Sequence, residues 1–185
     1  MEQQEAPPGT SGEMVKMVVA GITLDPSNNM PIIILKDAKG ETAIPIWIGL
    51  VEASAIATEL EGIKLARPMT HDLFKNVLET LGARLKKIEV CDLKENTFFA
   101  TMYLDHQGTL IEIDARPSDA IALAIRTNAE IYVARKVIDG SQQVDLGTIK
   151  ELEQANTPGE AGDKKDKWSQ ILESLRPEDF GKYKM

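Results

Sequence analysis

Residues 97–127 read TFFATMYLDHQGTLIEIDARPSDAIALAIRT, and this stretch decides the fold. Two runs, Thr97–Leu104 and Thr109–Ala115, are rich in the β-branched and aromatic residues of strands, and DHQG between them is a turn. The run that follows, Ser118–Thr127, is apolar almost all round, which predicts a deeply buried helix. Antiparallel strands followed directly by a buried helix indicate an α+β protein and not a doubly wound parallel sheet.

The same signals recur on both sides of this stretch. The strand pattern at Leu85–Leu93 completes one three-stranded antiparallel meander, and a second meander is expected earlier in the chain. Pro45 cannot donate a ladder hydrogen bond, so its strand is expected at a sheet edge or a bulge. The other expected elements are strands at 15–24, 31–35, 42–48 and 131–133, helices between Gly49 and Gly62 and at 70–81, and a helical turn at 134–138.

The predicted fold is therefore α+β, with two three-stranded antiparallel meanders and intervening helices. The order is three strands, two helices, three strands, a helix and a strand. Residues 1–13 hold Pro, Gly, Ser and Glu with almost nothing to bury, which predicts a disordered leader. The domain is expected at 14–139. Residues 140–185 are expected to form a helical C-terminal appendage with a polar linker at 157–167 and a short amphipathic helix at 168–175.

Composition excludes several classes of protein. With one cysteine and two histidines in 185 residues, the chain can form no intrachain disulfide and no zinc site of four cysteines or of two cysteines and two histidines. The histidines could at most supply part of a metal site whose other ligands are Asp or Glu. The longest apolar runs are far shorter than the roughly 20 residues of a membrane helix, and the acidic N-terminus lacks the features of a signal peptide. A cytoplasmic protein without a membrane partner is the simplest interpretation. The net charge of −8 is unlike that of a generic nucleic-acid-coating protein, although residues 14–140 are nearly balanced.

One short motif occurs twice, each time before a predicted helix. It reads ARPMTHD at residues 66–72 and ARPSD at residues 115–119. In each copy a hydroxyl side chain, Thr70 or Ser118, is the expected N-cap, and an acid follows in the first turn. A helix N-terminus with an arginine beside it can hold a phosphate, so Arg67, Arg116, Thr70 and Ser118 are candidate phosphate-binding residues.

The same motif has a structural interpretation. Both arginines could instead pair with nearby acids, such as Asp72, Asp114 or Asp119, and lock loops in place. An enzyme should bring the two Arg-Pro sites together in one open cleft, whereas a purely structural motif should bury them in pairs.

A histidine and four acids are the candidate catalytic residues. The histidine side chain in general titrates near neutrality, which makes His71 a candidate general base, and carboxylates bind hard cations through oxygen. A divalent cation, Mg²⁺ or Mn²⁺, is therefore a candidate cofactor. The competing interpretation of His71 is an exposed residue in the first turn of a helix. The candidate set is His71, Asp72, Asp114, Asp119 and Glu52.

Four stretches together resemble the bifunctional nuclease domain family, long catalogued as a bacterial domain of unknown function. They read IPIWIG at 44–49 followed by Glu52 and Ala53, RPMTHDL at 67–73, TFFA at 97–100 and IDARPSDAIALA at 113–124. The resemblance spans Met14 to Asp139, and the segment 177–183 resembles the tail of some bacterial members. It implies a compact, oligomeric α+β domain with nuclease activity, because plant members are described as having both RNase and DNase activity.

Two functions follow as alternatives. The first is a nuclease that hydrolyses phosphodiester bonds of RNA or DNA. The second is a non-enzymatic oligomeric module that binds a small anionic ligand or a protein partner. In both cases a homo-oligomer, most simply a dimer, is expected, because an Ala-lined helix and an almost wholly apolar helix offer more apolar surface than one small core hides.

Overall fold

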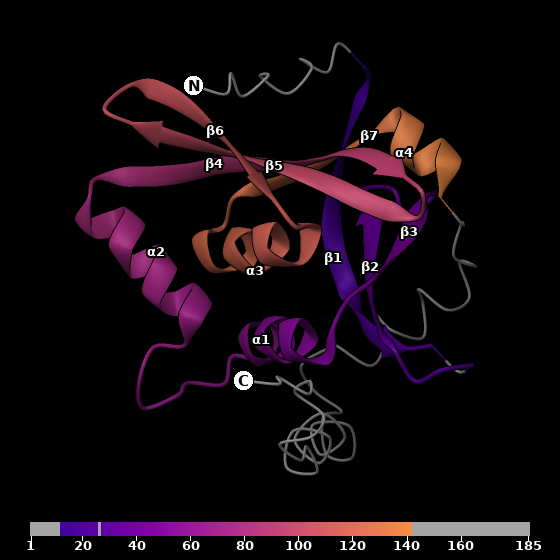
Figure 1. Cartoon of the computed structure of the whole chain (residues 1–185), viewed down its shortest axis with the longest axis horizontal. Coiled ribbons are helices and arrows are strands. Elements are labelled where there is room, and N and C mark those ends of the chain that lie inside the picture. Colours follow the sequence, from indigo (N-terminus) through magenta and orange to yellow (C-terminus); the bar gives the residue numbers. More distant parts are fainter. Residues whose placement is uncertain (1–11, 26, 142–185) are drawn as a thin grey trace, which may run out of the picture.

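The seven strands form one sheet in the order β3-β2-β1-β7-β4-β5-β6 (Figure 1). The structure, a computed structural model, describes residues 12–25 and 27–141. The predicted α+β class is confirmed. The leader up to residue 11 and the appendage from residue 142 onward lie outside the described residues, and the domain boundaries stay a prediction.

Two groups of three strands pair antiparallel within each group, and a late strand joins them. The strands are β1 (Met14–Leu24), β2 (Pro31–Asp37), β3 (Ala43–Trp47), β4 (Ala83–Lys94), β5 (Thr97–His106), β6 (Thr109–Ala115) and β7 (Glu130–Ala134). Strand β7 pairs antiparallel with β1 and parallel with β4, so the groups become one sheet. Strand β3, which contains Pro45, lies at one end of the sheet order, as expected for a strand with a proline in its ladder.

Three helices lie together on one side of the sheet (Figure 1). They are α1 (Leu50–Leu60), α2 (Thr70–Thr80) and α3 (Pro117–Thr127), and a short α4 (Arg135–Gly140) packs on β4 and β7. Helix α3 contacts α1, α2 and the sheet. It is buried along nearly its whole length, as its apolar sequence predicted.

The core consists mainly of aliphatic side chains between the sheet and these helices. Small buried residues, Ala53 and Ala57 on α1 and Ala120 and Ala124 on α3, allow the helices to approach closely. Strand β2 is buried on both faces from Pro31 to Leu35. No helix among residues 12–25 and 27–141 is long and apolar enough to cross a membrane.

Two predicted helix caps are wrong. Helix α2 has Met69 at its N-cap and Thr70 at its first helical position, and α3 has Arg116 at its N-cap with Ser118 two residues inside. For α2 the reason is the acid that follows. The Asp72 carboxylate accepts the Met69 N–H at 3.0 Å, so that the helix starts one residue earlier than a threonine cap would place it.

Candidate functional site

Each of the three long helices has an acid at the third position of its first turn. These acids are Glu52 on α1, Asp72 on α2 and Asp119 on α3. The helix dipole favours a negative charge at this position. Each of these acids is also bound by an arginine of α3 or of its N-cap, so one helix ties together the starts of all three.

Arg116, the N-cap residue of α3, lies between two of these carboxylates. Its Nε and Nη2 donate to the two oxygens of Asp119 at 2.7 and 3.2 Å, a bidentate pair, and its Nη1 donates to Glu52 Oε1 at 2.9 Å. The Arg116 side chain is still 66% exposed. These bonds use three of the five N–H donors of the guanidinium, so two donors have no partner among the described residues.

His71 joins the same cluster through Asp119. Its Nε2 lies 3.2 Å from Asp119 Oδ1, and its side chain is only 15% exposed. His71 is therefore not the exposed first-turn residue of the competing interpretation. Burial alone would raise the pKa of the Asp119 carboxyl, but the hydrogen bonds from Arg116 and His71 outweigh burial and hold the pKa below its usual range. Asp119 is thus a carboxylate at neutral pH.

A glycine makes room for Glu52. Gly49 is the N-cap of α1, and a Cβ built there would meet the Glu52 carboxylate. Glycine leaves this carboxylate room to fold back over the start of α1 toward Arg116.

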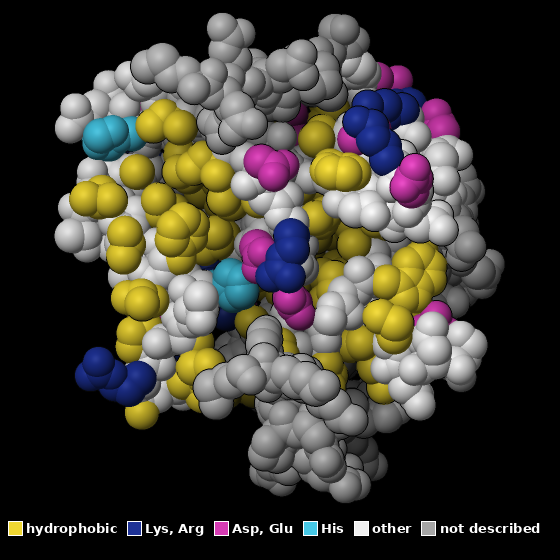
Figure 2. Space-filling view, in the orientation of Figure 1, with side chains coloured by type: hydrophobic (Ala, Val, Ile, Leu, Met, Phe, Trp, Pro, Cys, Tyr) yellow, Lys and Arg dark blue, Asp and Glu magenta, His cyan; other side chains and the backbone are white. Residues whose placement is uncertain are grey.

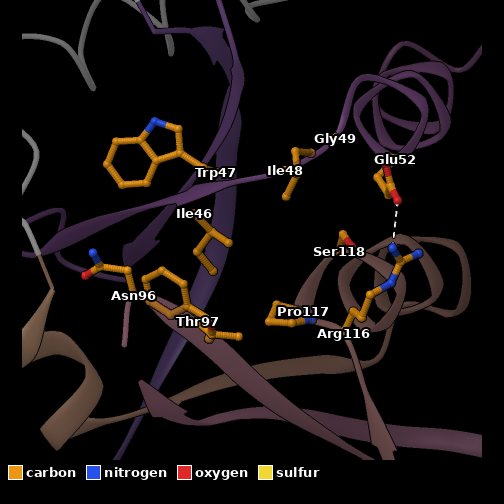
Figure 3. Close-up of a pocket in the computed structure, with 11 residues that line it drawn as sticks. Ile46, Trp47, Ile48, Gly49, Glu52, Asn96, Thr97, Arg116, Pro117 and Ser118 are labelled. Atoms are coloured by element: carbon orange, nitrogen blue, oxygen red, sulfur yellow. Dashed lines mark hydrogen bonds and ion pairs between the residues drawn. The ribbon is translucent and has the colours of Figure 1, made fainter. Parts of the chain in front are cut away.

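A pocket of about 280 Å³ opens beside Arg116 (Figure 3). Strand β3 and the start of α1 form one wall, the turn before β5 forms another, and the start of α3 forms the third. In the space-filling view, a histidine and a basic side chain gather with acidic ones near the middle of this face (Figure 2). The pocket is lined by Ile46, Trp47, Ile48, Gly49, Glu52, Asn96, Thr97, Phe98, Arg116, Pro117 and Ser118.

Asp72 belongs to a different cluster, which the sequence did not reveal. Its Oδ1 accepts Arg126 Nε at 2.6 Å, and the same guanidinium donates to the carbonyls of Ala122 and Ala55 at 2.9 and 2.8 Å. The Arg126 side chain is 3% exposed. The hydrogen bond from Arg126 is the main reason why the pKa of Asp72 lies below its usual range. The sequence feature that could have pointed to this cluster is Arg126, an arginine near the end of an otherwise apolar helix.

Three other predicted site residues lie apart from Arg116. Asp114 follows Ile113 and precedes Ala115, which both pack on the core, so alternation points Asp114 to the opposite face of the sheet. Arg67 and Thr70 are exposed and do not line the pocket. Arg67 makes no hydrogen bond or ion pair within residues 12–25 and 27–141. The two Arg-Pro motifs therefore do not converge on this pocket.

The motifs differ because the spacing from arginine to acid differs. Arg116 precedes its helix acid by three residues and can bind it within one turn, whereas Arg67 precedes Asp72 by five. The structure thus brings together Glu52, His71, Arg116 and Asp119, with Ser118 lining the pocket beside them.

The carboxylates as they stand do not fit a metal ion. Arg116 lies between Glu52 and Asp119 and binds both oxygens of Asp119 and one oxygen of Glu52, so a cation would have to displace it. Across the part of the chain that the structure describes, no three His, Cys, Asp or Glu side chains are grouped to hold one. Mg²⁺ and Mn²⁺, the candidate cofactors, therefore do not match this arrangement of side chains.

Fold and site together define an α+β protein with an arginine–carboxylate–histidine cluster at the helix starts. The sequence pattern of the bifunctional nuclease domain matches residues 33–145, which contain the whole cluster and the pocket. The chain belongs to the bifunctional nuclease domain family.

Relatives occur in bacteria and plants. An uncharacterized protein of Mycobacterium tuberculosis (strain ATCC 25618 / H37Rv) is 37% identical over 167 residues, which cover 90% of this chain and 98% of that protein. Bifunctional nuclease 1 of Arabidopsis thaliana is 27% identical over 139 residues, 72% of this chain and 41% of the plant protein. Bifunctional nuclease 2 of Oryza sativa subsp. japonica is 27% identical over 131 residues, 68% of this chain and 40% of the plant protein.

Proposed function

We propose that this protein is a nuclease that hydrolyses phosphodiester bonds of RNA and DNA at the Arg116 cluster. The observation that carries the proposal is the exposed Arg116 guanidinium, which keeps two donors free while Asp119 holds both it and His71. Family membership and the names of the plant relatives support the same activity. The activities of those plant proteins are properties of chains more than twice as long as the matched part.

The cluster suggests how the reaction proceeds. An enzyme that cuts DNA as well as RNA cannot depend on a 2′-hydroxyl, so the nucleophile is water. With Nε2 of His71 donating to Asp119, the other ring nitrogen, Nδ1, is free to take a proton from that water. The water oxygen bonds to phosphorus, the P–O bond to the leaving sugar oxygen breaks, and a solvent proton neutralises that oxygen.

Arg116 and Asp119 assist this step in different ways. The free donors of Arg116 bind the phosphate oxygens, where negative charge increases in the transition state. Asp119 touches no substrate; it positions the imidazole and stabilises it once protonated. Glu52 holds the opposite side of the guanidinium and fixes its plane.

Cleavage of labelled single-stranded RNA and DNA tests the proposal, with and without Mg²⁺ or Mn²⁺. Arg116→Ala should lower the rate by roughly one to two decades, the value of a charge-assisted bidentate contact. His71→Ala should abolish most of the remaining rate. Arg67→Ala is the matched control, because it removes an arginine from the same Ala-Arg-Pro context outside the pocket. A wild-type protein that cuts neither strand under any of these conditions contradicts the proposal.

A second candidate function is an oligomeric module that binds a small anionic ligand or a protein partner. The observation that favours it is the apolar surface of α2, where Leu73, Phe74 and Val77 are 55%, 38% and 42% exposed. Apolar side chains also gather on this side of the space-filling view (Figure 2). Such a patch is typical of an interface, and a homodimer is the proposed assembly. Sedimentation equilibrium that shows only the 20.4 kDa monomer at micromolar concentration contradicts it.

A further inference from the structure

The pocket beside Arg116 combines an apolar floor with polar side chains at its rim. Ile46 and Ile48 are 2% and 6% exposed, and Pro117 lies across from them (Figure 3). Phe98 also lines the pocket. Pockets for drug-sized ligands are about 300–1,000 Å³, so one of about 280 Å³ suits a single flat ring system.

Hydrogen-bonding groups around this floor are unused. Ser118 is 8% exposed, lines the pocket and makes no side-chain hydrogen bond within the described residues. The side chains of Asn96 and Thr97, at the turn into β5, likewise have no partner in that part of the chain. Together they offer hydroxyl and amide groups, which both donate and accept. A purely apolar ligand would cover the Ser118 hydroxyl without giving it a hydrogen-bond partner.

The charges that line the pocket limit the ligand further. Arg116 is the one cation among the lining residues and Glu52 the one anion, and no lysine is present. Proteins that bind long single strands use a basic groove that follows the backbone, which these lining residues do not form. Since Arg116 is the one cation that lines the pocket, the pocket can bind one phosphate group.

We infer that this pocket binds one unpaired nucleobase while the phosphate of the same nucleotide lies against Arg116. The inference rests on the proposed function and gives it a substrate class: a single-stranded end or a short single strand, because a base inside a duplex cannot enter. The base lies on the apolar floor, and Ser118, Asn96 and Thr97 meet its polar edge.

Equilibrium binding separates the base from the phosphate. Calorimetric titration compares adenosine 5′-monophosphate with ribose 5-phosphate, which lacks the base. The monophosphate should bind about tenfold tighter, because binding removes the apolar faces of its base from water. Equal binding of the two, or no binding of the monophosphate up to about 10 mM, overturns the inference.

A variant that fills the pocket provides the second test of the inference. Thr97→Trp places a large ring in the pocket from an exposed strand start and should weaken monophosphate binding about tenfold or more, while ribose 5-phosphate is unaffected. Thr109→Trp, at the exposed start of β6 outside the pocket, is the matched control. Ser118→Ala should weaken the monophosphate by about 2- to 10-fold. If Thr97→Trp and Thr109→Trp behave alike in a folded protein, the inference fails.

Salt dependence tests the single phosphate contact. For a strand of about 12 nucleotides, log K against log salt should fall with a slope near −0.7, the value for one neutralised phosphate of a single strand. A slope several times steeper would show that the protein contacts many phosphates along the strand, and it would contradict a single phosphate contact at Arg116.

The outcomes for binding and for cleavage are distinct. If the base strengthens binding but no strand is cleaved, the nucleobase pocket is supported and the proposed nuclease activity is contradicted. If Thr97→Trp does not change cleavage and the two probes bind equally, the nucleobase pocket is contradicted. The proposed nuclease activity is still supported in that case.

Discussion

The two ends of α3 each carry an arginine that binds the first-turn acid of a helix, yet they differ in almost every other respect. At the start of the helix, the Arg116 side chain is 66% exposed and holds Asp119 with two donors still free. At its end, the Arg126 side chain is 3% exposed and holds Asp72 together with two backbone carbonyls. The same pair of residue types therefore forms an open site at one end and a closed structural contact at the other.

Exposure decides the difference. A guanidinium in solvent can exchange one anion for another, because water compensates each partner while it is released. A buried guanidinium cannot, because every partner that it loses leaves a charge or a carbonyl without a hydrogen bond. Arg126 therefore contributes stability, and Arg116 is available for a ligand.

The largest expected effect is at the buried end. Arg126→Met should destabilise the fold by about 3 kcal/mol, because it leaves Asp72 and two carbonyls without a donor, and it should lower Tm by roughly 6–12 °C. Thermal unfolding followed by circular dichroism measures this. A Tm within about 2 °C of wild type would show that the contacts of Arg126 with α1 and α2 do not stabilise the fold.

The acid partner of Arg126 gives the next effect, and it depends on pH. The pKa of Asp72 is lowered from 3.8, mainly by the Arg126 hydrogen bond, so the ionised form stabilises the fold above that pH. This stability is lost as pH falls through the lower, folded-state value. Asp72→Asn should cost about 1–2 kcal/mol at pH 7, and the gap from wild type should close as pH falls below 3.8 and through the lower folded-state pKa. Urea unfolding at several pH values checks this, and a gap that stays constant down to about pH 2 contradicts it.

At the start of α3, loss of the exposed arginine should have little effect on stability. Arg116→Ala should change the free energy of unfolding by less than about 1 kcal/mol, because exposed ion pairs contribute little, although it removes bonds to Asp119 and Glu52. Chemical denaturation of the preparation that is used for the cleavage assay measures it. A loss as large as that of Arg126→Met would make Arg116 a structural residue as well.

A smaller effect is expected one position before α1. Gly49→Ala should lower stability by roughly 0.5–1 kcal/mol, because a Cβ there meets the Glu52 carboxylate and alanine is a poor N-cap. Loss of the Glu52 bond frees a further Arg116 donor, so an anionic ligand such as phosphate should bind a few-fold tighter. Calorimetric titration with phosphate checks the direction, and weaker binding would contradict it.

The smallest effect is expected at the other Arg-Pro motif. Arg67→Ala removes an exposed side chain that has no partner within the described residues, and it should change stability by less than about 0.5 kcal/mol. A clear loss of oligomer mass in this variant would place Arg67 in an interface between copies.

Local sequence signals predicted the parts of the molecule that local chemistry determines. The burial of α3 follows from its apolar sequence, and the contact between Arg116 and Asp119 follows from a spacing of three residues. The outward position of Asp114 is also predictable, since strand alternation with Ile113 inside places it on the other face.

Contacts between distant parts of the chain could not be predicted in this way. Arg126 and Asp72 are 54 residues apart, and no periodic pattern links them. The repeated Ala-Arg-Pro suggests two equivalent sites, but two additional residues before Asp72 break the equivalence. The strand at 131–133 can be predicted from its residues, yet its place between β1 and β4 depends on the whole sheet.

The position of β7 has a consequence for how the chain folds as it is synthesised. Residues 14–47 and 83–115 each form three strands, but residues 130–134, which join the two groups, are synthesised after both. Until then β1 and β4 each present an unpaired edge, and their union requires closure of a loop that spans most of the domain. We therefore expect β7 to dock after the two three-stranded groups have formed, and a chain without residues 130–134 leaves β1 and β4 with open edges.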